Sequence, residues 1–184
     1  MIRYGWIYVG CFLLAQNGER NMPVSNVQQK TVAPQKVEFP FPEIPATLTE
    51  PEARKSYLLT HYWDKFSFAD TTLVNNRDVT EQGFVNFIAL LLDGTTSEEL
   101  ARESLKNWCK GFVGKDHARR VLTQTADDYL FNPNSPFYNE GLYGLYLETM
   151  LGVLPQTDAR RSTYGFKLKL LRRNNVGSRA TDFA

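Results

Sequence analysis

The sequence predicts an all-α fold, an array or bundle of about six helices in which successive helices are antiparallel neighbours. Apolar residues recur at three- and four-residue steps along most of the chain, the period of a helix with one buried face. Capping residues precede these segments, and only residues 164–170 alternate as a strand does. The long run without turn residues favours a helix there as well. A tetratricopeptide-like stack of helix pairs is the alternative architecture, although no fixed-period repeat is evident.

Short connections join the predicted helices, which is typical of helices that pack beside one another. The first opens with the capping box Thr49-Glu-Pro-Glu52, and the third opens with Thr96-Ser-Glu-Glu99 in the same way. Asp78 begins the second helix and Asp116 the fourth. The expected spans are residues 49–66, 78–94, 96–114, 116–130, 135–150 and 157–173.

Two glycines, Gly141 and Gly144, lie inside the fifth predicted helix. Each lowers helix stability by about 1 kcal/mol relative to alanine. Close contact with a neighbouring helix is the simpler explanation for both, and a ligand cleft is the alternative.

Residues 1–15 have the pattern of an export signal, because Arg3 precedes an apolar run that gives way to polar residues. A helix needs about 20 residues to cross a hydrocarbon core, so this run is too short for a permanent membrane span. Two processing routes are open, cleavage after Ala15 or acylation of Cys11 as in a lipoprotein. A buried N-terminal strand or helix is the third alternative. We expect an exported protein of the periplasm or cell envelope, bound to the membrane only if Cys11 carries a lipid anchor.

Residues 16–48 are expected to form an extended linker, because five prolines prevent a helix there. Phe39, Phe41 and Ile44 depart from the polar pattern of this linker. We expect them to lie extended across the helical domain, with a docking tail for a partner as the alternative.

Charge is distributed unevenly, although the net charge of +1 argues against nucleic acid as a partner. Residues 42–104 contain eleven acidic and five basic side chains, whereas residues 158–184 contain seven basic and two acidic ones. This asymmetry favours contact between the two stretches. The basic side chains are expected to form a solvated helix face, with contact to a partner or to anionic lipid as the alternative. The candidate interaction surface comprises Tyr62, Trp63, Arg160, Arg161, Lys167 and Arg172.

Candidate catalytic groups are few. His61 and Asp64 lie one helical turn apart and could form an oriented acid–base pair beside Tyr62 and Trp63. Exposed helix pairs of this kind are common, so a surface ion pair is the simpler interpretation. Cys109 lies at a core position of the third predicted helix, where a buried and unreactive thiol is expected. The histidines and cysteines have no metal-ligand or redox spacing, so we expect no metal and no cofactor.

The segment Asn174-Asn-Val-Gly-Ser-Arg-Ala-Thr-Asp-Phe-Ala184 resembles the opening of a thioredoxin-like domain of the peroxiredoxin and envelope thiol-disulfide oxidoreductase type. With the segments 39–45, 61–66 and 167–171, it makes residues 38–184 resemble a helical domain of unknown function, number 5106 of that series. That domain precedes the thioredoxin-like domain in Bacteroidetes envelope proteins. The residues that match the opening motif are Val176, Gly177, Ala180, Asp182 and Phe183.

The resemblance implies a helical domain over residues 49–174, followed at residues 175–184 by the first residues of a thioredoxin-like domain. It implies a non-catalytic domain that holds, orients or supplies partners to a thioredoxin-like domain of its own or of another envelope protein. The redox dithiol would lie beyond these residues, so no enzyme activity is expected of them. Two other functions stay open: a module that binds envelope peptides or glycans, and a stand-alone enzyme that uses His61 and Asp64.

Overall fold

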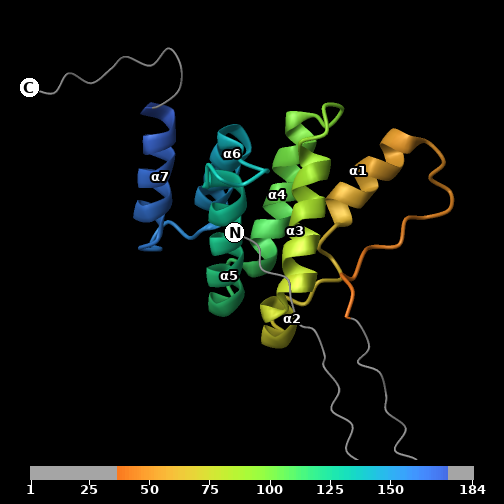
Figure 1. Cartoon of the computed structure of the whole chain (residues 1–184), viewed down its shortest axis with the longest axis horizontal. Coiled ribbons are helices and arrows are strands. Elements are labelled where there is room, and N and C mark those ends of the chain that lie inside the picture. Colours follow the sequence, from red (N-terminus) through yellow and green to blue (C-terminus); the bar gives the residue numbers. More distant parts are fainter. Residues whose placement is uncertain (1–36, 174–184) are drawn as a thin grey trace, which may run out of the picture. The chain divides into compact units, whose positions relative to one another are not determined.

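The computed structural model describes residues 37–173, which form seven α-helices and a π-helical segment, η1, with no strand among them (Figure 1). This confirms the all-α class. The expected export segment with Cys11 and the motif at 175–184 lie outside the described residues. Within the described range, no helix is long and apolar enough to cross a membrane. The elements are α1 (Pro51–His61), α2 (Thr71–Asn75), α3 (Arg77–Leu91), α4 (Glu98–Phe112), α5 (Asp116–Ala126), η1 (Asp127–Phe131), α6 (Glu140–Val153) and α7 (Arg161–Arg173).

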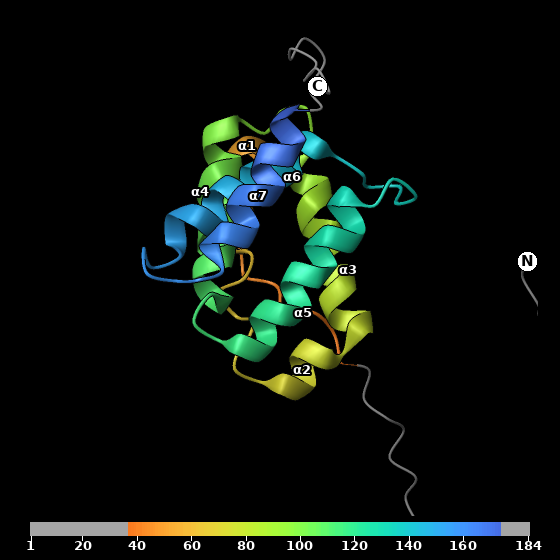
Figure 2. The ribbon, with the colours of Figure 1, turned by 90° about the vertical axis from the view of Figure 1, so that its left-hand side faces the viewer.

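The helices are arranged in two rows (Figure 2). α4 packs against both α1 and α6, and α6 packs against α7, which gives one row of four helices. α3, α2 and α5, with η1 as the continuation of α5, form the second row. α6 and α7 are antiparallel neighbours, because Arg161 at the start of α7 donates a hydrogen bond to the Leu154 carbonyl just after α6. The main neighbours of α4, in contrast, are not consecutive with it along the chain.

Side-chain caps set the starts of α4 and α6. Ser97, one residue after the predicted start at Thr96, caps α4 by accepting the Leu100 N–H at 3.2 Å. Asn139 caps α6 by accepting the Leu142 N–H at 2.8 Å. The predicted helix start at Ser135 is wrong, because its hydroxyl instead accepts the Phe137 N–H in a turn that precedes the helix.

α7 also begins later than predicted. Its first residue is Arg161 rather than Thr157. Asp158 accepts the backbone N–H of Arg160 at 2.9 Å, so the intervening residues form a turn. The sequence pattern does not distinguish this turn from a first helical turn, because both favour aspartate near the start.

α1 is shorter than predicted. It starts at Pro51 after Glu50, and no side chain completes the expected capping box. It ends at His61, where the chain turns and the Phe66 N–H bonds to the Trp63 carbonyl. This turn directs the apolar side chains that follow α1 into the core. α2, which the sequence analysis did not predict, comes next and is capped by the Asp70 carboxylate.

The core is built largely from aromatic rings. Trp108 of α4 is completely buried at its centre. Ring centroids of five other side chains lie 5.0–6.1 Å from that of Trp108, within the range of favourable edge and offset contacts. These five are Trp63, Phe84, Phe87, Phe112 and Tyr146.

Two glycines make room for this aromatic packing. A Cβ at Gly83 of α3 would overlap the ring of Phe39, which the segment before α1 inserts into the core. A Cβ at Gly111 of α4 would likewise overlap the ring of Phe68. Phe41, which neighbours Phe39, is exposed instead. The helix backbones at these two glycines therefore form part of the surface against which the rings pack.

Candidate functional site

The predicted acid–base pair forms on the surface. His61 Nδ1 lies 2.7 Å from the Asp64 carboxylate, and the two side chains are 39% and 59% exposed. A hollow of about 370 Å³ nearby is lined by Asp64, Trp63 and Asn107, but His61 is not part of its lining. The pair thus has the geometry of an exposed ion pair one turn apart, which contributes little to stability.

Tyr62 and Trp63 lie in the core and contribute no interaction surface. Tyr62 is completely buried, and its hydroxyl donates a 2.9 Å hydrogen bond to the Gly83 carbonyl. Burial raises the pKa of this hydroxyl well above its ordinary value. Trp63 is only 4% exposed. The prediction that these two rings form a surface is wrong, because the turn after α1 directs both inward.

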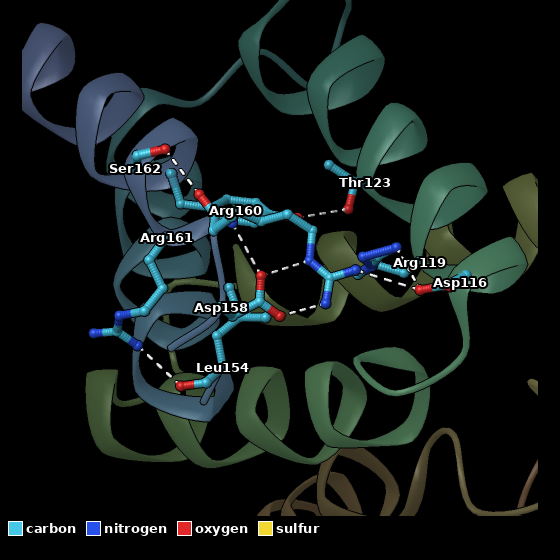
Figure 3. Close-up of polar contacts among 10 residues, drawn as sticks. Asp116, Arg119, Thr123, Leu154, Asp158, Arg160, Arg161 and Ser162 are labelled. Carbon is cyan, nitrogen blue, oxygen red and sulfur yellow. Dashed lines mark hydrogen bonds and ion pairs between the residues drawn. The ribbon is translucent and has the colours of Figure 1, made fainter. Parts of the chain in front are cut away.

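The basic residues at the start of α7 bind to other parts of the domain (Figure 3). The Arg160 guanidinium contacts both carboxylate oxygens of Asp158 and lies 3.3 Å from Asp116 of α5. Asp116 also accepts a 2.7 Å hydrogen bond from Arg119, whose guanidinium is almost fully buried. Arg161 donates to backbone carbonyls at the end of α6. These contacts join the connection before α7 to α5 and α6.

The other two basic candidates also make internal ion pairs. Lys167 Nζ lies 2.6 Å from the Asp127 carboxylate of η1, which also accepts the Tyr143 hydroxyl. Arg172 lies 2.9 Å from Glu148 of α6. The acidic partners of these basic residues therefore lie between residues 116 and 158. None of these ion pairs involves an acidic residue of 42–104, where the uneven charge distribution predicted the partners to be. The four basic side chains attach α7 to the domain.

A groove of about 470 Å³ lies between α4, α6 and α7, near the end of α3. Seven of its sixteen lining residues are aliphatic, seven are polar or charged, and two are glycines. The C-terminal half of α7 forms one wall and the N-terminal half of α6 forms another. The apolar residues of the lining are Leu91, Leu92, Ala101, Leu142, Leu145, Leu168 and Leu171.

Gly144 of α6 opens onto this groove together with Gly141. No heavy atom outside the local backbone lies within 4 Å of the position that a Cβ of Gly144 would take. Close helix contact therefore does not explain this glycine. Gly144 instead lies at the wall of a groove.

A chain of ion pairs forms the charged rim of the groove. Arg102 lies 2.7 Å from Glu98 and 2.9 Å from Glu148, and Glu148 also binds Arg172. Hydrogen bonds from Arg102 and then Arg172 hold the pKa of Glu148 below its ordinary value. The rim charges are thus largely neutralised by one another.

Cys109 is not exposed as a surface thiol. It is completely buried in α4, and burial raises its pKa well above the ordinary thiol value. In the described part of the chain, no three histidine, cysteine, aspartate or glutamate side chains gather as a metal site would need.

The comparisons with known proteins agree with this helical architecture. The model of a family described as a domain of unknown function, DUF5106, matches residues 14–174. The chain belongs to the DUF5106 family. A solved thioredoxin-like protein from Bacteroides caccae is 31% identical to it, with a TM-score of 0.65. That match covers 79% of this chain and 52% of the other, so the chain spans about half the length of that protein. No curated protein matches the chain.

Sequence reasoning offered a cleft at Gly141 and Gly144 of this DUF5106 chain only as the alternative to close helix contact, and it missed the other residues of the groove. The available signal was the spacing of Gly141, Gly144, Leu145 and Glu148, which places them along one side of a helix. Nothing in that spacing distinguishes a groove from a packed helix contact. Arg102, which bridges two elements of the rim, belongs to a different helix and was not singled out.

Proposed function

We propose that this DUF5106 chain is a non-catalytic accessory domain of an exported thioredoxin-like protein, and that it holds and orients a thioredoxin-like domain of the cell envelope. The similarity to a thioredoxin-like protein about twice as long as the part that it matches carries the proposal. Burial of Cys109, with its raised pKa, supports a role in contact rather than in thiol chemistry. The apolar run after Arg3 supports export.

The aliphatic groove favours a polypeptide partner over a glycan. Glycan sites present aromatic rings with polar groups beside them, whereas the rings of this domain lie mainly in the core and none of them lines the groove. A peptide-binding module therefore remains the second candidate function, at the same groove.

Two measurements test the proposal. The coding sequence after residue 184 is expected to continue into a strand followed by a Cys-x-x-Cys motif, and a stop codon there would contradict a fused thioredoxin-like domain. The full-length protein is then expected to reduce insulin disulfides, whereas residues 1–184 alone are inactive. Cys109→Ser serves as the control and leaves the full-length activity unchanged. Reduction by residues 1–184 alone would overturn the non-catalytic assignment.

A further inference from the structure

The glycines that line the groove between α4, α6 and α7 lower the stability of helix α6. A glycine in a helix interior lowers stability by about 1 kcal/mol relative to alanine. At Gly83 this loss is explained, since the ring of Phe39 occupies the space. At Gly144 nothing within the described domain occupies it. A large side chain at Gly144 would occupy part of the groove. Glycine therefore leaves open a space that no other part of the described domain fills.

The surface of the groove suits a folded protein better than a small charged ligand. Its lining includes six leucines, and Leu92 among them is 40% exposed. The rim charges of Glu98, Arg102, Glu148 and Arg172 already pair with one another. An apolar centre surrounded by a satisfied polar rim is the usual organisation of a protein–protein interface.

The position of the groove indicates which protein covers it. α7 is the last helix described, and Leu168, Leu171 and Arg172 near its end line the groove. The family match ends at residue 174, whereas the solved relative is about twice as long as the matched part. A domain joined after α7 therefore begins next to the groove, within a few residues of chain.

We infer that this groove is the docking surface for the thioredoxin-like domain that follows α7 in the same polypeptide. The inference rests on the proposed function and specifies the surface through which it operates. Docking covers the exposed Leu92 and the half-buried Leu145 of the groove. The tether through α7 raises the local concentration of the partner domain, so a modest surface is sufficient.

Gly144→Phe in the full-length protein tests the inference, with Gly165→Phe as the matched control. Both glycines are half-buried in helix interiors with open space at the Cβ position, but only Gly144 lines the groove. The wild-type protein and the control are expected to unfold in one cooperative calorimetric transition, because docking couples the two domains. Gly144→Phe is expected to separate this into two transitions. Circular dichroism of residues 1–184 carrying each variant verifies that the helices form.

A second pair of variants distinguishes loss of docking from misfolding. Leu92→Lys places a charge at the groove edge, and Phe166→Lys places one on the outer face of α7, where Phe166 is 63% exposed. Loss of coupling with Leu92→Lys but not with Phe166→Lys supports the groove.

Three results would overturn the inference. The first is coupling that survives both groove variants, and the second is loss of coupling with Phe166→Lys alone. Either result would overturn the inference and leave the proposed function intact. Independent unfolding of the wild-type domains would also exclude docking. The proposed function fails separately, if no thioredoxin-like domain follows residue 184.

Discussion

The aromatic region around Trp108 and the region around α7 use glycine in opposite ways. In the first, Gly83 and Gly111 yield space to the rings of Phe39 and Phe68. In the second, Gly144 and Gly165 face open space. A glycine inside a helix can thus indicate either the closest packing in a domain or its absence, and only the neighbouring elements show which.

The two regions also differ in what holds them together. Aromatic side chains dominate the first, and its stability depends on shape and on buried apolar area. The contacts of α7 combine three buried apolar side chains with ion pairs to η1 and α6, and Arg160 in the connection before α7 adds an ion pair to α5. We therefore expect steric changes to act most strongly on the first region and changes of charge or pH on the second.

The largest expected effect is that of Gly83→Ala. The new methyl group would overlap the ring of Phe39 and force it out of the core, which should destabilise the domain by about 3 kcal/mol. Urea unfolding followed by circular dichroism measures this. In a background that carries Phe39→Ala the same substitution should cost much less, and an equal cost in both backgrounds would show that the ring is not the cause.

Removal of the Asp127 carboxylate should have a smaller effect. Asp127→Ala leaves Lys167 and the Tyr143 hydroxyl without their shared partner, at a cost of about 1.5 kcal/mol. Thermal unfolding of this variant and of Asp128→Ala, at the exposed neighbouring position, provides the comparison. Equal stability of the two variants would mean that the contact between η1 and α7 contributes nothing measurable.

Gly144→Ala should change stability in the direction opposite to Gly83→Ala. With open space around the position, the methyl group meets no obstacle and the helix gains about 0.5–1 kcal/mol. A rise in Tm of residues 1–184 would verify this. A fall in Tm would mean that the groove closes on Gly144 in solution, and would refute the contrast between the two regions.

The smallest expected effect concerns pH. The pKa of Glu148 is lowered by Arg102 and Arg172, so its ion pairs stabilise the domain above the pKa of the unfolded chain. This stabilisation is lost as the pH falls below the ordinary glutamate pKa and through the lower pKa of the folded state. Solvent screening limits it to less than about 0.5 kcal/mol.

Glu148→Gln should therefore reduce the dependence of Tm on pH in this acidic range. Glu103→Gln, at an exposed position of α4, is the control and should leave the pH profile unchanged. Identical profiles for the two variants would show that the rim ion pairs do not contribute to stability.

Helix class and most helix positions could be predicted because they depend on local properties. The cap of α4 falls at Ser97, one residue after the predicted Thr96, and the apolar period of α4 places Leu105, Trp108 and Cys109 in the core. The predicted starts at Ser135 and Thr157 were wrong because turn residues and cap residues have the same preferences.

Contacts between distant residues could not be predicted in this way. The pairing of Lys167 with Asp127, or of Arg172 with Glu148, depends on which faces of the helices meet. The inward direction of Tyr62 and Trp63 depends on a turn whose sequence continues the helical pattern.

The sequence by itself determined an all-helical domain, its principal apolar faces and its resemblance to the DUF5106 family, since periodicity, caps and short motifs are local features. Only the tertiary structure decided that Arg161, Lys167 and Arg172 of α7 bind within the domain. It also decided that Gly144 opens onto a groove while Gly83 receives a ring. The physical reason is that space and charge partners at a residue are supplied by other elements of the fold, whose positions no single segment encodes.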